Sequence, residues 1–88
     1  MQRISFDAGE QRHIKILIHS IKNDPFVIRN AKWELVCAGT VESYGDCEIE
    51  EHVIDAFIAP QSRSMYRLRI QYEIADEVLV EQMEVVVV

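Results

Sequence analysis

In the stretch YRLRIQYEI, Tyr66 to Ile74, large apolar side chains alternate with charged or polar ones at every position. Side chains of a β-strand point alternately to opposite faces of its sheet, so this pattern predicts a strand with one buried and one exposed face. No part of the chain shows the 3.6-residue period of an amphipathic helix. Extended segments are expected at residues 4–6, 13–21, 26–37, 46–52, 53–59, 66–74 and 77–88. The sequence therefore predicts an all-β protein.

Turn signals separate these segments, the clearest being Asn23-Asp24-Pro25 and the residues after Pro60. Gly39-Thr40 and Tyr44-Gly45-Asp46 mark a loop or a short extra strand. The apolar phase slips near Arg29-Asn30, which predicts a bulge or a break. A second bulge is expected in the last strand, where Glu81, Gln82 and Glu84 are all taken as outward. About seven strands spaced by 8–12 residues predict an antiparallel β-sandwich, with a small barrel as the alternative.

Two aromatic residues favour an immunoglobulin-like sandwich. Trp33 stands in the middle of the third strand, and Tyr66 lies two residues before Leu68 in the penultimate strand. Those are the places of the core tryptophan and the corner tyrosine of such domains, with Ile16 and Leu68 where antibody domains carry paired cysteines. The expected core residues are Ile16, Trp33, Leu35, Tyr66, Leu68 and Ile70.

Length and charge restrict the classes of partner. The 88 residues allow one domain, residues 1–88, with a thin core. Fifteen acidic and nine basic side chains give a net charge of −6, which disfavours nucleic acid because a polyanion needs a concentrated basic surface. No signal peptide or membrane-length apolar run is seen, so we expect a cytoplasmic chain without a membrane partner.

The sequence offers little chemistry. Asp46, Glu48, Glu50 and His52 alternate as if on one strand face, where they would hold a cation or form a solvated acidic edge that opposes aggregation; the edge is favoured. No metal or cofactor is expected. The histidines have no serine or cysteine at a triad-like spacing, so we expect no enzyme.

Two cysteines, Cys37 and Cys47, lie as if on two strands of one hairpin and would be able to face each other. Because a cytoplasmic chain keeps its thiols reduced, we expect free, partly buried cysteines rather than a disulfide.

The last four residues, Val85, Val86, Val87 and Val88, are apolar on both faces of the final strand. Either this strand is central, or these valines form an interface with a second copy or a protein partner, by face packing or by strand addition.

The order of the motifs suggests a family. Residues 5–10 (SFDAGE) precede an alternating strand, which is followed by Ala31-x-Trp33-x-Leu35 and by Pro60 before Tyr66-x-Leu68. This order resembles immunoglobulin-like domains of phage tail and baseplate proteins. The resemblance implies a non-enzymatic structural subunit that oligomerises and is assembled into a virion. The alternative is a monomeric module that binds a protein or carbohydrate, with Tyr44, Tyr72 or Arg69 as contacts.

Overall fold

The protein is described by a computed structural model that covers residues 2–19 and 25–88. Within these residues the chain forms eight strands and no helix. The strands are β1 (Arg3–Phe6), β2 (Arg12–Leu17), β3 (Ile28–Cys37), β4 (Thr40–Asp46), β5 (Glu48–Glu50), β6 (Val53–Ile58), β7 (Met65–Ile74) and β8 (Glu77–Val87). The expected end of the second strand and the Asn23-Asp24 turn fall in residues 20–24 and lie outside the described residues.

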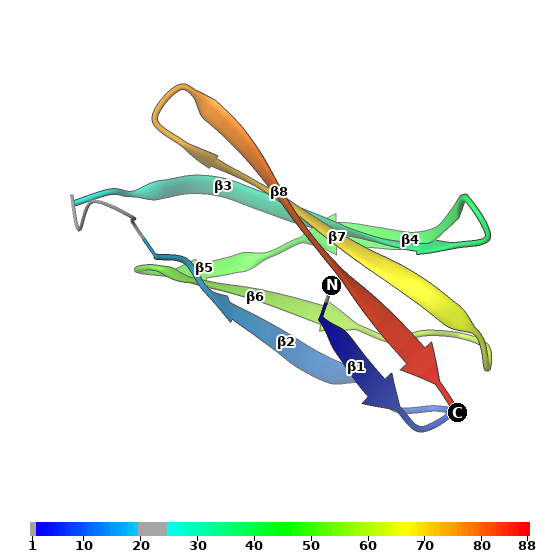
Figure 1. Cartoon of the computed structure of the whole chain (residues 1–88). Coiled ribbons are helices and arrows are strands. Elements are labelled where there is room, and N and C mark those ends of the chain that lie inside the picture. Colours follow the sequence, from blue (N-terminus) through cyan, green and yellow to red (C-terminus); the bar gives the residue numbers. More distant parts are fainter. Residues whose placement is uncertain (1, 20–24) are drawn as a thin grey trace.

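The strands form two layers, seen one above the other in Figure 1. The larger sheet has the order β1-β8-β7-β3-β4, and the smaller has the order β2-β6-β5. Only the β1–β8 pairing is parallel among those described. The smaller sheet has the B-E-D order of an immunoglobulin-like domain, and β8-β7-β3-β4 has its G-F-C-C′ order. The expected fold, an immunoglobulin-like antiparallel β-sandwich, is confirmed, with eight strands instead of about seven.

The segment from Thr40 to His52 differs from the expectation. It contains two strands in different sheets, where the sequence suggested a loop or a short extra strand followed by one strand over residues 46–52. The short extra strand is present as β4, whereas the single strand over residues 46–52 was wrong. The chain leaves the larger sheet at Cys47, whose amide still donates to the Ala31 carbonyl at 2.9 Å. Residues 40–46 pair with β3 because Ala38 and Gly39 close a two-residue turn, both with positive φ.

The two expected bulges had different outcomes. The pairing of β3 with β7 shifts register between Ile28 and Asn30, which confirms the first. The second was wrong, because β8 pairs with β7 without a shift from Val86 to Glu77. Glu81 occupies an inward position and is nevertheless exposed, because β1 pairs with β8 only from Glu84 to Val87 and leaves Glu81 at an open edge of the larger sheet.

The core fills the space between the two layers. Of the expected core residues, Leu35, Tyr66, Leu68 and Ile70 are buried, whereas Ile16 and Trp33 are half-buried and pack against the buried cluster. The alternation that defines residues 66–74 is therefore present throughout β7: the apolar side chains enter the core, and the charged side chains line the outer face of the larger sheet.

The two cysteines are free and half-buried. They do not face each other: Cys37 pairs with Thr40 at one end of β3, and Cys47 lies beside Ala31, six positions back along the same strand. Six residues of extended chain measure about 20 Å, which is too far for a disulfide.

Candidate functional site

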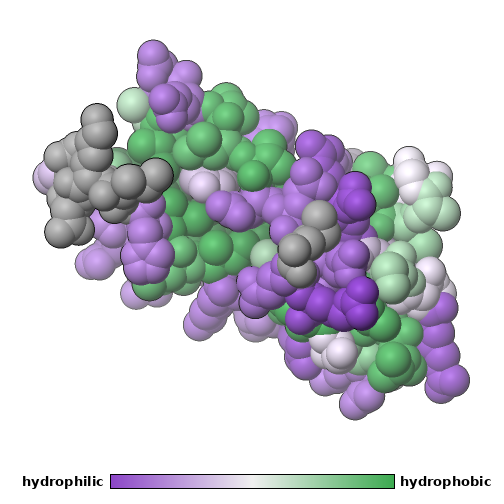
Figure 2. All heavy atoms as spheres, viewed as in Figure 1, coloured by the Kyte–Doolittle hydropathy of each residue, from purple (hydrophilic) through white to green (hydrophobic). Residues whose placement is uncertain are grey.

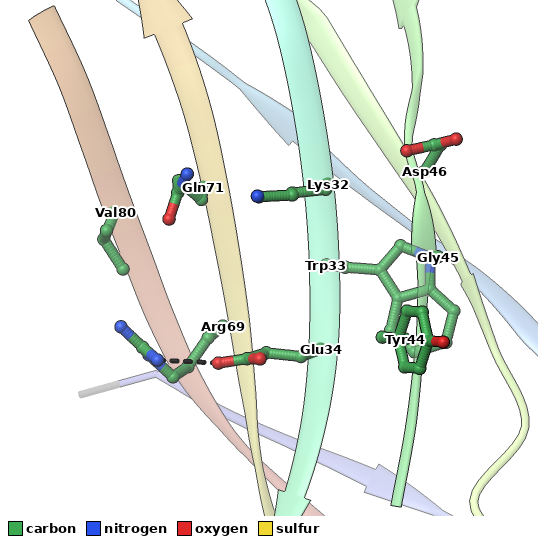
Figure 3. A pocket seen from close by; sticks show the side chains of 9 residues that line it. All are labelled: Lys32, Trp33, Glu34, Tyr44, Gly45, Asp46, Arg69, Gln71 and Val80. Carbon is green, nitrogen blue, oxygen red and sulfur yellow. Dashed lines mark hydrogen bonds and ion pairs between the residues drawn. The ribbon is translucent and has the colours of Figure 1, made fainter. Parts of the chain in front are cut away.

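The outer face of the larger sheet carries a groove at the side where β4 forms the edge. Two rows of residues meet there, because the registers of the strands place Tyr44, Glu34 and Arg69 side by side, and likewise Asp46, Lys32 and Gln71. The groove has a volume of about 630 Å³. It is lined by Lys32, Trp33, Glu34, Tyr44, Gly45, Asp46, Arg69, Gln71 and Val80 (Figure 3).

The charges of the groove are balanced. Arg69 donates through Nη1 to Oε1 of Glu34 at 2.6 Å, the pair marked by the dashed line in Figure 3. Lys32 and Asp46 face each other across β3 and β4. A partly exposed ion pair contributes only about 0–1 kcal/mol to stability, so the Arg69–Glu34 pair mainly fixes the orientation of the guanidinium.

An exposed tyrosine borders this groove, and a tryptophan packs on the inner face of the same sheet. Tyr44 is 80% exposed, the highest fraction among the large hydrophobic residues described. The Trp33 indole extends over Gly45 (Figure 3), and a Cβ at that glycine would lie 3.1 Å from the indole Nε1. The absence of a side chain at Gly45 therefore makes room for the tryptophan, and the exposed tyrosine beside it is free to contact a ligand.

A bulge in β4 ties this edge strand to β7. Leu35 pairs with Ser43 and Val36 with Val41, which leaves Glu42 as the extra residue. Its carboxylate accepts hydrogen bonds from the Tyr66 hydroxyl at 2.7 Å and from the Gln61 amide at 3.3 Å. The Tyr66 oxygen in turn accepts from the Ser62 amide at 3.1 Å, the upstream backbone contact of a tyrosine corner. Sequence reasoning identified Tyr66 but gave no role to Glu42.

The acidic run does not form one strand face. Asp46 ends β4 in the larger sheet, whereas Glu48 and Glu50 lie on β5 in the smaller one. His52 lies in a turn, where its Nε2 is 3.1 Å from the Phe26 carbonyl oxygen and its ring stacks on Phe26 at 4.0 Å. Residues 2–19 and 25–88 contain no cluster of histidine, cysteine and carboxylate groups that would hold a metal ion.

Cys47 lies where the chain passes between the sheets. Burial, together with the smaller effects of the Asp55 and Asp46 carboxylates, raises the pKa of its thiol to about 11. A thiol with so high a pKa remains protonated at neutral pH and is a poor nucleophile.

The C-terminal valines are divided between two environments. Val85 and Val87 are buried in the core, so they are not available to a partner. Val86 lies opposite Met65 on the outer face, and Val88 is 63% exposed. No further strand is able to pair with β8 between Glu84 and Val87, because β1 pairs with one side of this part and β7 with the other.

The expected ligand contacts are also divided. Tyr44 and Arg69 line the groove. Tyr72 is buried in the core, so its role as a contact was wrong. Burial and the neighbouring carboxylate of Glu81 raise the pKa of this tyrosine. On the side of the molecule drawn in Figure 2, apolar residues form a broad area toward the left, and hydrophilic residues dominate the middle of the view.

No protein-family model and no curated protein matches the chain. Among solved structures, the chain is similar to an engineered protein with a TM-score of 0.76 and 17% sequence identity. The similarity covers 99% of this chain and 18% of the engineered chain, so this chain spans less than a fifth of that protein's length. At this identity the likeness concerns the fold alone. None of the described segments is a helix of the length and hydropathy required to cross a membrane.

Proposed function

We propose that this domain is a non-enzymatic module that binds another protein through the groove on the outer face of its larger sheet. The observation that carries the proposal is the position of Tyr44, 80% exposed, in the same groove as the oriented Arg69 guanidinium. Tyrosine and arginine are enriched among the residues that dominate the binding energy of protein interfaces.

A protein partner is favoured by the position and charge of the groove. It lies on the outer surface of the sheet, and both signs of charge are present in it, with Lys32 and Arg69 against Glu34 and Asp46. An exposed aromatic side chain next to an arginine, with further charged residues around them, fits the aromatic centre and polar rim of a protein interface.

The test is a paired capture experiment from an extract of the source cells. The protein carries Tyr44→Ser in one sample and Phe57→Ser in the other, with the unchanged protein beside them. Phe57 is also exposed, at 47%, but it lies on the smaller sheet. A partner captured by the unchanged protein should be lost with Tyr44→Ser and retained with Phe57→Ser. Retention with both variants, at unchanged circular dichroism, would contradict the proposal.

Assembly with further copies of the chain is the second candidate function. It is favoured by Met65, which is 55% exposed opposite Val86, and by the exposed Val88 near the same end of the molecule. The virion as the place of assembly comes from the resemblance to phage proteins alone. Light scattering over a concentration series would detect an oligomer, and the double variant Val86→Lys/Val88→Lys should dissociate it while remaining folded. A monomer at every concentration would exclude this candidate.

A further inference from the structure

The outer edge of β4 is an open position for another strand. Four strands end the two sheets, and one of them is β4, whose residues Ser43–Asp46 follow the bulge at Glu42 in regular register with β3. Within the described residues no strand pairs with the side of β4 that faces away from β3. Its backbone groups on that side are therefore free to form a ladder with an extended segment.

We propose that β4 receives an extended, basic segment of a partner protein as an added strand. This inference rests on the proposed function, because the added strand would run beside the groove that contains Tyr44. The partner would bind by adding a strand to the sheet, and its segment would carry positive charge.

The central part of β4 lacks the usual protection of an edge strand. Natural edges commonly carry outward charges that oppose pairing with other chains. In β4 the only charge before Asp46 is Glu42, and its carboxylate is engaged by Tyr66 and Gln61. Val41 and Tyr44 are exposed on the same strand. The bulge at Glu42 limits a regular ladder to the part of β4 that follows it.

The charge around this edge selects the partner. Asp46 is followed in the chain by Glu48, Glu50 and Glu51, all exposed. The lysines on the neighbouring strands are Lys32, on β3 next to β4, and Lys15, on β2, which is separated from β5 by β6. A second copy of this chain would bring the same carboxylates and a net charge of −6, so repulsion opposes self-addition. A lysine- or arginine-rich strand complements this edge, and the Tyr44 ring offers a face for a cation.

The probe is a synthetic peptide of about eight alternating valine and lysine residues, with blocked ends, titrated into the 88-residue protein. Backbone amide signals and hydrogen exchange are followed by NMR. Binding should shift the amide signals of β4 and slow exchange along its outer side. The same peptide with valine and glutamate should bind at least about tenfold more weakly. A lysine peptide that does not bind, or that protects the edges of β1, β2 or β5 instead, would overturn the inference.

N-methylation at every residue of the lysine peptide separates strand addition from simple attraction of charges. It removes the backbone donors on both sides of the peptide and keeps the net charge, so binding should be lost. Equal binding of the methylated peptide would overturn the added strand. The Tyr44-dependent capture experiment is independent of this probe. If the methylated peptide binds equally but capture of the partner is still lost with Tyr44→Ser, only the added strand is excluded. If capture is retained with Tyr44→Ser, the proposed function itself is excluded.

Two charge variants test the selection of a basic partner. Glu48→Lys/Glu50→Lys should weaken binding of the lysine peptide by about tenfold, because the reversed charges follow directly after the end of β4 in the chain, on β5. The control Asp76→Lys/Glu77→Lys makes the same change in net charge in the β7–β8 hairpin, at exposed residues. It should weaken binding by less than about threefold at 0.15 M salt, because distant charges are screened. An equal effect of the two variants would contradict recognition of a basic strand at β4.

Discussion

The Tyr66 hydroxyl donates to Oε1 of Glu42 at 2.7 Å, and this hydrogen bond joins the buried strand β7 to the bulge of the edge strand β4. The same oxygen accepts from the Ser62 amide, so both the donor and the acceptor functions of the phenol are used. The position of the candidate edge thus depends on a residue of the core.

Tyr66→Phe tests this connection. The phenylalanine keeps the buried ring but leaves the Glu42 carboxylate and the Ser62 amide without their partner. A hydrogen bond to a charged group contributes about 1.5–3 kcal/mol, and we expect a loss of this size in the free energy of unfolding, measured in urea. Tyr44→Phe removes an exposed hydroxyl from the same sheet and should change the free energy of unfolding by less than about 0.5 kcal/mol. Equal effects of the two substitutions would exclude a structural role for the corner.

Gly45→Ala should destabilise the protein through Trp33. The φ of Gly45 is not in the left-handed region, so an alanine is acceptable to the backbone, but its Cβ would lie 3.1–3.2 Å from the indole. Overpacking of this kind costs about 1–3 kcal/mol. The double variant Gly45→Ala/Trp33→Phe should lose less stability than the sum of the single variants, because the smaller ring relieves the contact.

Ser43→Ala is the matched control on the same strand. The Ser43 Oγ is buried and has no hydrogen-bond partner among the described residues, so its removal should leave stability unchanged or raise it. If Gly45→Ala had no greater effect than Ser43→Ala in the same urea titration, contact with the indole would not be the reason for the glycine.

Ala38→Asn should stabilise the β3–β4 hairpin. Ala38 has a φ of +51° and precedes Gly39 at +79°, the combination that a type I′ turn requires. The left-handed region costs an ordinary L-residue about 1–2 kcal/mol, and asparagine tolerates it better than alanine. We expect a gain of about 0.5–1 kcal/mol in the free energy of unfolding. Ala8→Asn, at an exposed alanine without a positive φ, should give no gain.

The strands that line the core could be predicted, because strict alternation of apolar and polar side chains is explained by a strand with one buried face. In β7 the alternation is unbroken, and Tyr66 and Leu68 are buried as their positions require. In β8 the buried phase also continues from Val85 to Val87. Glu81 misled the interpretation, because an inward position at an open edge of the sheet is solvated without any bulge.

The region of the candidate site was less predictable, because its residues are governed by contacts far apart in the sequence. The chain leaves one sheet for the other at Cys47, and no local pattern of residues 46–52 distinguishes that change from one continuous strand. Glu42 acts through Tyr66, 24 positions away, and the groove around Tyr44 exists only after β3, β4 and β7 are paired. Composition correctly drew attention to the acidic residues but did not place them at two different edges.

The raised pKa of Cys47 predicts that the free energy of unfolding falls at alkaline pH. The pKa of its thiol rises from 9.0 to about 11 in the folded protein, mainly through burial. Below pH 9 the thiol is protonated in both the folded and the unfolded chain and has no effect on the pH dependence. Between pH 9 and 11 the unfolded chain loses this proton while the folded protein keeps it, so the free energy of unfolding falls as the pH rises.

Cys47→Ser removes the ionisation and should make that fall shallower in urea titrations at pH 8, 9, 10 and 11. Tyr72 also has a raised pKa and contributes in the same direction, but it is present in both proteins and cancels in the comparison. The same burial should make Cys47 react with a thiol reagent at pH 8 more slowly in the folded protein than in urea. Identical slopes of stability against pH in the two proteins would show that the thiol ionises equally in the folded and unfolded states.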